Sequence, residues 1–278
     1  MTLLAVPNVS EGRDHTTLDA IGTAFANAGA RLLDRHEDPD HHRAVFTLAG
    51  EPGALAPAVL AGAREAIKRI DVSRHAGQHP RVGAIDVAPI VYLDGADRGA
   101  AIAEALVLAD ALGREELPVY LYGALAGGRT RAELRRGGPE ALIARAAPDY
   151  GPPALHPTAG AVLVAAREPL VAFNVELAPP ATLADARAIA ALIREGGAEG
   201  LPGVRAIGVQ LSRAAQISTN VEDHRAATPA DVVAAVRRHA AVAAAELVAL
   251  APEAALAGFP GDVPLRNRAT IEERLYPR

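Results

Sequence analysis

The sequence predicts an α+β protein with two ferredoxin-like βαββαβ subdomains in pseudo-duplicate. Strand and helix patterns occur in the order βαββαβ in the first half, and the same order returns in the second half. The opening strands are alike, since the apolar runs from Leu3 and from Leu170 each end near an asparagine, Asn8 and Asn174. This order is typical of an antiparallel sheet with helices on one face. We place the two subdomains at residues 1–177 and 178–278.

Apolar periodicity and turn signals define the elements of the first half. Asp14 is the expected N-cap of a helix over 14–28. The segment Asp38-Pro-Asp-His-His42 predicts a turn between two strands, because proline and aspartate favour turns. The expected strands are 3–9, 31–37, 43–49 and 82–93, with a second helix at 53–69.

The second half repeats these signals after a connecting region. Thr228 and Pro229 have the pattern of a cap and first-turn residue. The expected strands are 170–177, 204–211, 215–221 and 247–250, and the expected helices are 183–195 and 229–244. The connecting region predicts a helix at 101–112, a strand at 118–124, an arginine-rich stretch at 129–145 and a proline-rich loop at 148–160. Long loops in compact proteins are commonly functional.

Composition excludes several classes of protein. Half of the 278 residues are apolar and 22% are charged, which is typical of a globular protein. A net charge of −5 and 3% aromatic residues argue against nucleic-acid binding. The absence of cysteine excludes disulfides, zinc–thiolate sites and thiol nucleophiles. The N-terminus has no signal-peptide pattern and no apolar run is long enough to span a bilayer, so we expect a cytoplasmic protein without a membrane partner.

The segment from His75 to Asp86 carries the strongest chemical signal. His79 precedes Pro80, which favours an extended backbone at the histidine, and Gly77 and Gly83 allow the chain to bend closely around a ligand. An imidazole with a pKa of about 6.5 populates both protonation states near neutrality, as a general acid–base catalyst requires. A histidine that only fixes the loop is the alternative for His79, and loop support is the preferred interpretation of His75.

Other side chains are candidates for substrate binding. Arg43 and Arg81 suit carboxylates, because the guanidinium fork binds them in bidentate fashion, although solvated surface charge is the alternative. Asp86 would orient an imidazole or act as an ordinary strand-edge acid. Three asparagines at predicted strand ends, Asn8, Asn174 and Asn220, would contact a pterin edge or form turns. Gln216 alternates with Ser218 on one face of a predicted strand and would line a ligand site or lie exposed on the sheet.

Six motifs, in order along most of the chain, resemble the glutamate formiminotransferase family. They are Val6-Pro-Asn-Val-Ser-Glu-Gly12, Asp38-Pro-Asp-His-His-Arg43, His75-Ala-Gly-Gln-His-Pro-Arg-Val-Gly-Ala-Ile-Asp86, Pro118-Val-Tyr-Leu-Tyr-Gly123, Pro148-Asp-Tyr-Gly-Pro152 and Ala215-Gln-Ile-Ser-Thr-Asn220. The resemblance implies transfer of a formimino group from N-formimino-L-glutamate to tetrahydrofolate in histidine breakdown and one-carbon metabolism. It also implies N- and C-terminal formiminotransferase subdomains with a ligand tunnel between them.

The resemblance also assigns residues. The family's catalytic histidine corresponds to His79. Its folate-binding loop corresponds to Gly151, Pro152, Pro153, Ala154, Leu155, His156, Pro157, Thr158, Ala159 and Gly160. Tetrahydrofolate is then a co-substrate, and we expect no metal. Exposed ferredoxin-like sheets often pair, so a homodimer is a further expectation. Where the family pattern has His-Asn-Arg, this chain has His41-His42-Arg43.

Two other functions remain open at this point. The histidines at positions 36, 41, 42, 75 and 79, with nearby aspartates, are ligand types for zinc or manganese and permit a metal-dependent hydrolase, although no H-E-x-x-H spacing occurs. The other alternative is a folate-binding homologue without transfer activity, in which the substitution at His42 has removed catalysis.

Overall fold

The computed structural model describes residues 1–75 and 80–277. The chain divides into two compact units, residues 1–168 and 169–278, each with its own sheet and apolar core. The boundary follows Glu168 rather than residue 177, because the strand over 171–177 pairs with strands of the second unit. No helix in the described part of the chain is long and apolar enough to cross a bilayer.

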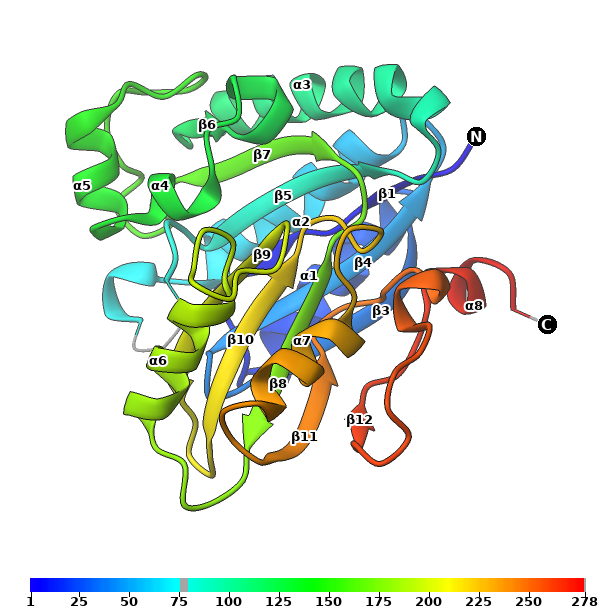
Figure 1. The fold of residues 1–278 in the computed structure, drawn as a ribbon. Helices are drawn as coiled ribbons and strands as arrows, with labels where there is room; N and C mark the ends of the chain where they lie inside the picture. Colours follow the sequence, from blue (N-terminus) through cyan, green and yellow to red (C-terminus); the bar gives the residue numbers. More distant parts are fainter. Residues whose placement is uncertain (76–79, 278) are drawn as a thin grey trace. The chain divides into compact units, whose positions relative to one another are not determined.

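The sheet of the first unit contains the predicted ferredoxin-like arrangement (Figure 1). Its strands are β1 (Leu3–Ala5), β2 (Asn8–Val9), β3 (Arg31–Asp38), β4 (Arg43–Gly50), β5 (Ile85–Tyr92), β6 (Val119–Leu121) and β7 (Val162–Arg167). Both β1 and β2 lie antiparallel between β4 and β5, and β3 pairs with β4. The single strand expected at 3–9 is thus two short strands, separated at Val6 and Pro7, and Pro7 has no N–H for the sheet.

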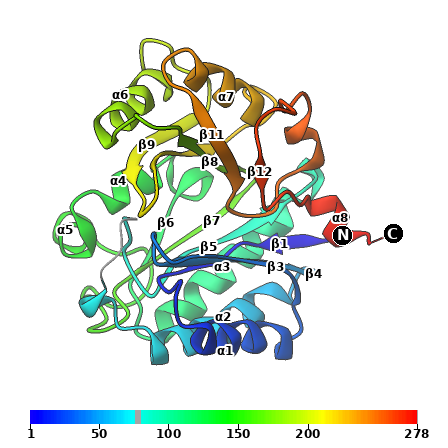
Figure 2. The same ribbon diagram turned by 90° about the horizontal axis from the view of Figure 1, so that it is seen from below.

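Three helices of the first unit cover one face of this sheet (Figure 2). They are α1 (His15–Asn27), α2 (Leu55–Arg69) and α3 (Arg98–Arg114). The predicted cap is confirmed, since Asp14 accepts hydrogen bonds from the N–H groups of Thr16 and Thr17. Apolar side chains from these helices pack on alternate residues of the strands, such as Phe46 and Leu48, and this burial is the main stabilising contribution of the layer.

The connecting region extends the sheet beyond the ferredoxin-like pattern. No strand was predicted from the sequence at the position of β7, which pairs in parallel with both β5 and β6. The arginine-rich stretch forms two short helices, α4 (Arg131–Arg135) and α5 (Gly138–Arg145). Their residues Leu134 and Leu142 pack with Tyr120 and Leu163 in a separate apolar cluster. The first sheet is therefore mixed rather than purely antiparallel.

The second unit is the predicted βαββαβ fold with a short extension. Its elements are β8 (Val171–Leu177), α6 (Leu183–Ile193), β9 (Val204–Gln210), β10 (Ala215–Val221), α7 (Pro229–Arg237), β11 (Val242–Leu247), β12 (Leu265–Arg266) and α8 (Ile271–Leu275). The strand order is β12-β11-β8-β10-β9, and the four main strands are antiparallel. As predicted, Thr228 caps α7, and its hydroxyl accepts from the N–H of Asp231.

One helix and one strand of this unit differ from the sequence prediction. The helix expected over 229–244 ends at Arg237, and the strand expected at 247–250 instead runs from Val242 to Leu247. The alanine-rich segment has a high intrinsic helix propensity, but Ala245 and Leu247 pair with β8. Tertiary pairing therefore outweighs local propensity in this segment.

Candidate functional site

Three of the sequence motifs, at 6–12, 38–43 and 75–86, and the predicted folate loop meet in the first unit at the flanks of a short segment. That segment is 76–79, and the predicted catalytic His79 lies in it, outside the described residues. Its two flanks are described and end at His75 on one side and Pro80 on the other. The structure therefore shows what surrounds the entry and exit of the segment that carries His79.

The predicted folate loop, residues 151–160, is hydrogen bonded on both sides of that segment. On the entry side, the N–H of Val72 donates to the carbonyl oxygen of Thr158 at 2.8 Å. On the exit side, the N–H of Ala84 donates to Ala159 O at 2.9 Å, and Gly83 and Gly160 form a β-bridge. The backbone thus joins the loop assigned to folate to both flanks of the segment assigned to proton transfer.

A glycine is required at position 160 because the folate loop and the segment at Val82 approach each other closely there. Its φ is +69°, a conformation that side-chain-bearing residues rarely adopt. A Cβ atom at this position would lie 2.3 Å from the carbonyl oxygen of Val82. Any larger residue would separate the folate loop from the exit of the 76–79 segment.

The motif from Val6 to Gly12 is hydrogen bonded to the same exit flank, at Gly83 and Ala84. Ser10 donates through its backbone N–H to Ala84 O at 2.8 Å and through its hydroxyl to Gly83 O at 2.7 Å. The Glu11 carboxylate accepts hydrogen bonds from successive N–H groups just before α1. The amide of Asn8 donates to Val6 O at 3.0 Å, which is the turn-forming interpretation of this candidate.

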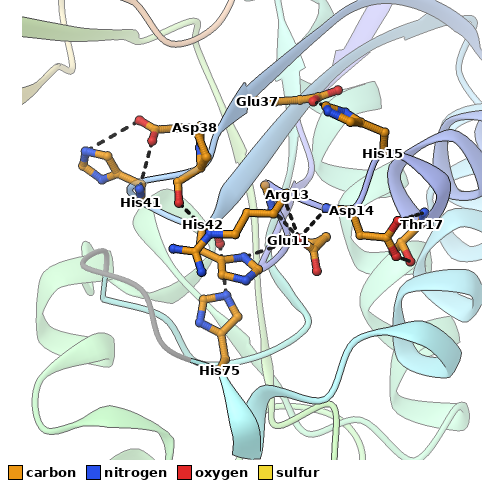
Figure 3. A network of polar contacts seen from close by, with 12 residues as sticks. Glu11, Arg13, Asp14, His15, Thr17, Glu37, Asp38, His41, His42 and His75 are labelled. Carbon is orange, nitrogen blue, oxygen red and sulfur yellow. Dashed lines mark hydrogen bonds and ion pairs between the residues drawn. The ribbon is translucent and has the colours of Figure 1, made fainter. Parts of the chain in front are cut away.

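A cluster of histidines lies at the entry side (Figure 3). The rings of His42 and His75 are 4.1 Å apart between centroids, and His75 Nε2 lies 3.0 Å from His42 O. Because a carbonyl oxygen only accepts, this nitrogen is the donor. His42 Nδ1 lies 3.5 Å from a Glu11 oxygen, and His41 Nε2 lies 3.7 Å from Asp38.

Burial opposes the protonation of these imidazoles. Burial, together with smaller contributions from the charges of Arg81 and His42, lowers the pKa of His75 to about 4. Burial also lowers the pKa of His42 and of His41, while the carboxylates of Glu11 and Asp38 respectively oppose the shift. A group with a pKa near 4 carries no proton to exchange at neutral pH. The geometry therefore favours loop support as the role of His75.

Asp86 is a buried carboxylate that pairs with Arg135 and acts electrostatically on Arg81. It is 2% exposed, and one carboxylate oxygen accepts from the N–H of Val82 at 2.7 Å. The other oxygen forms an ion pair with Arg135 of α4. Asp86 also raises the pKa of Arg81 against the lowering by burial. The structure thus connects the predicted candidates Asp86 and Arg81, and the described partners of Asp86 include no imidazole.

No functional role was predicted for residues 131–135, which form α4. Arg131 and Arg135 are four residues apart and so share one face of the helix. Arg131 lies over the ring of Tyr122, with 5.9 Å between its guanidinium carbon and the ring centroid. Thr130 and Glu133 form a capping box, and this T-x-x-E pattern in the sequence could have identified the helix and the spacing of its arginines.

The three candidate amides of the second unit share one face of its sheet. Gln216 lies opposite Glu176, and Asn220 lies on the same face of β10, opposite Ala172. Asn174 lies opposite Ser218 on β10 and Glu246 on β11. The apolar residues between them pack in the core instead. The strand register thus brings Asn174, Gln216 and Asn220 to one face of this sheet, and their role in substrate binding stays a prediction.

The Asn174 amide is buried and has no hydrogen-bond partner among the described residues. Its side chain is 1% exposed, and neither its nitrogen nor its oxygen is bonded. Glu176, on the same face, is instead paired with Arg213 and Arg266, and these hydrogen bonds lower its pKa against the effect of burial. An unbonded buried amide costs free energy, so Asn174 is well placed to bind a ligand with adjacent donor and acceptor groups.

A pocket of about 510 Å³ lies elsewhere in the first unit, beside α4 and α5. Its lining includes Gly127, Gly128, Arg136 and Arg145. Arg145 donates to backbone carbonyl oxygens at the end of α4, which gives it a structural role. None of the site residues predicted from the sequence lines this pocket.

Comparison with known proteins identifies the relatives of the chain. Residues 2–167 match the family model described as the formiminotransferase domain, N-terminal subdomain. The chain is 38% identical to the formimidoyltransferase-cyclodeaminase of Mus musculus over 277 residues, covering 90% of this chain and 50% of that protein. The chain spans about half the length of the animal relatives that it matches.

Two shorter relatives have a single activity in their names. The glutamate formimidoyltransferase of Streptococcus pyogenes serotype M1 is 37% identical over 228 residues, which cover 78% of this chain and 76% of the relative. The glutamate formimidoyltransferase of Thermoplasma acidophilum is 33% identical over 270 residues, which cover 90% and 88%.

Proposed function

Because the chain belongs to the formiminotransferase family, we propose that it transfers the formimino group of N-formimino-L-glutamate to tetrahydrofolate. The products are 5-formiminotetrahydrofolate and L-glutamate, in histidine degradation. One structural observation carries the proposal: the loop assigned to folate is hydrogen bonded to both flanks of the segment that contains His79. This arrangement supports a folate co-substrate next to a proton-transfer group.

The proposed reaction needs two proton transfers. The N5 nitrogen of tetrahydrofolate attacks the formimino carbon and loses its proton, and the C–N bond to glutamate then breaks as the departing amine gains a proton. One imidazole performs both steps when it accepts the first proton and returns it to the leaving nitrogen. His79 is the proposed shuttle. Its neighbour His75 has a pKa lowered to about 4, mainly by burial, which makes His75 a poorer proton carrier near neutral pH.

Holding the two substrates in line contributes more to the rate than the base, which supplies about 10²- to 10⁴-fold. Positioning two reactants can supply roughly 7–11 kcal/mol of the barrier of a bimolecular reaction. The proposed positioning groups in the first unit are Arg43, Arg81 and the loop 151–160. In the second unit, Asn174 is proposed to bind the donor–acceptor edge of the pterin, since its own amide is buried and unbonded.

The remaining assignments follow from the same family membership. We assign the first unit to the N-terminal formiminotransferase subdomain and the second unit to the C-terminal one. Cytoplasmic location, a homodimer, a ligand tunnel and the absence of a metal stay predictions.

The direct test is incubation of the purified protein with formiminoglutamate and tetrahydrofolate. The proposal predicts the cyclised folate that forms when 5-formiminotetrahydrofolate is treated with acid, in proportion to enzyme concentration. Folate binding in a calorimeter without any such product would instead identify a non-catalytic homologue. Stoichiometric zinc in the active protein would support the metal-dependent hydrolase.

A further inference from the structure

The ring of His156 closes the turn at the end of the predicted folate loop. His156 exchanges two backbone hydrogen bonds with Gly160, at 3.0 and 2.9 Å, and residues 157–159 form the turn between them. Within this turn, the ring atom Nδ1 accepts from the N–H of Thr158 at 3.3 Å and from the N–H of Ala159 at 3.0 Å. The histidine therefore takes the part that an asparagine or aspartate side chain plays in an Asx turn.

These contacts decide which nitrogen of the neutral ring carries the proton. A nitrogen that accepts from backbone N–H groups has no proton of its own, so the neutral imidazole of His156 is protonated at Nε2. Within the described part of the chain, the hydrogen bonds of the ring are made by Nδ1. The ring thus acts on the loop as an acceptor, through one nitrogen.

One peptide group connects the ring to the entry flank of the segment that carries His79. The peptide between Thr158 and Ala159 is trans, so its N–H and C=O point in opposite directions. Its N–H donates to the ring at 3.0 Å, and its carbonyl oxygen accepts from the N–H of Val72 at 2.8 Å. The ring therefore fixes the orientation in which this carbonyl oxygen meets Val72. A hydrogen bond at one end of a peptide also polarises it and strengthens the bond at the other end.

The exit flank is held by backbone groups alone. The next peptide donates from Gly160 N–H to the carbonyl oxygen of His156 at 2.9 Å, and its own carbonyl oxygen accepts from the N–H of Ala84 at 2.9 Å. Gly83 and Gly160 also form a β-bridge. None of these bonds uses the ring, so a change of side chain at position 156 should affect the contact with Val72 more than the contact with Ala84.

We propose that His156 is a positioning residue for the transfer reaction, whose Nδ1 orients the Thr158–Ala159 peptide and so keeps the folate loop on Val72. The role of the ring is then within the loop, rather than on the folate. The consequence for catalysis rests on the proposed function, whereas the orientation of the peptide can be tested without any reaction. Positioning of the reactants supplies a large part of the rate of a bimolecular transfer, so a looser loop should slow turnover.

The test compares His156→Asn with His156→Gln. The Oδ1 atom of asparagine is as many bonds from the backbone as Nδ1 of histidine, so it can accept from the same two N–H groups, as in an Asx turn. The amide of glutamine replaces the Nε2–H donor instead and is one bond too long for this turn. His239→Gln is the control for the substitution itself, since His239 lies in the second unit and pairs with Glu199. Thermal unfolding verifies that each variant is folded.

The first readout is amide hydrogen exchange, which needs no substrate. In His156→Gln, the N–H of Val72 should exchange about tenfold faster than in wild type, while that of Ala84 should change less than about threefold. In His156→Asn and His239→Gln, both amides should stay within about threefold of wild type. The ¹⁵N spectrum of the wild-type ring adds a measurement that depends on no variant. A neutral ring protonated at Nε2 is expected, and a proton on Nδ1 would overturn the proposal.

The second readout is turnover with formiminoglutamate and tetrahydrofolate. The kcat of His156→Gln should be at least about tenfold below that of His156→Asn. If the glutamine variant is instead the faster one, the ring acts on a substrate through Nε2 and the proposal is wrong. Equal kcat values in the two variants would also refute it. If wild type shows no transfer but exchange at Val72 still depends on an acceptor at position 156, the proposed function fails and the orientation of the peptide by His156 stands.

Discussion

Replacing Asp86 with asparagine isolates the effect of the buried ion pair on stability. The asparagine oxygen can still accept the hydrogen bond from the N–H of Val82, so the main loss is the negative charge opposite Arg135. Removing one partner of a buried pair costs about 3–5 kcal/mol. The Arg135 side chain is 13% exposed and can recover some hydration, so we expect about 3 kcal/mol. In a unit of this size, that is a decrease in Tm of roughly 6–12 °C.

The matched control is Asp110→Asn, which breaks an ion pair on the surface. Arg114 and Asp110 are 2.7 Å apart, but their side chains are 78% and 48% exposed. An exposed pair of this spacing contributes about 0.3–0.5 kcal/mol, so Tm should change by no more than about 1–2 °C. Both variants are compared by circular dichroism during heating and by urea unfolding. Equal losses in the two variants would show that burial does not strengthen the Asp86 pair, and the argument would be refuted.

Three further predictions concern pH, the folate loop and the second unit. His75 has a folded pKa of about 4 against an ordinary value of 6.5, so its contribution to the stability of the fold is present above pH 6.5 and is lost as the pH falls toward 4. In urea unfolding, His75→Gln should therefore reduce the loss of stability on the acid side. The control His15→Gln, at an exposed histidine, should not reduce it. Gly160→Ala places a Cβ 2.3 Å from a carbonyl oxygen and should lower stability by about 1–3 kcal/mol and weaken folate binding, while Gly99→Ala, which meets open space, should do neither. Asn174→Leu should leave stability unchanged or higher and weaken tetrahydrofolate binding about tenfold; unchanged folate affinity would remove Asn174 from the site.

The sequence predicted most of the fold because its signals are local and periodic. The cap at Asp14, the turn between β3 and β4 and the repeated βαββαβ order each depend on a few adjacent residues. By contrast, β7 follows a proline-rich loop and pairs with strands that are distant in sequence, so no local pattern marks its partners. The segment after α7 has a helical composition, and only its pairing with β8 makes it a strand.

The candidate site was predictable in its motifs but not in its contacts. The sequence suggested that residues 151–160 and His75 to Asp86 act together, and the hydrogen bonds of Thr158 and Ala159 explain how. It did not indicate that Asp86 is paired with Arg135, since 49 residues separate them. Ion pairs between distant segments depend on tertiary packing, so a residue type and its local spacing cannot predict them.

The most direct test of the account is the transfer rate of His79→Ala, measured together with its affinity for tetrahydrofolate. If His79 carries protons during transfer, turnover should fall at least about a hundredfold while the Kd for tetrahydrofolate stays within about threefold of wild type. Turnover close to the wild-type value with unchanged folate affinity would contradict the account.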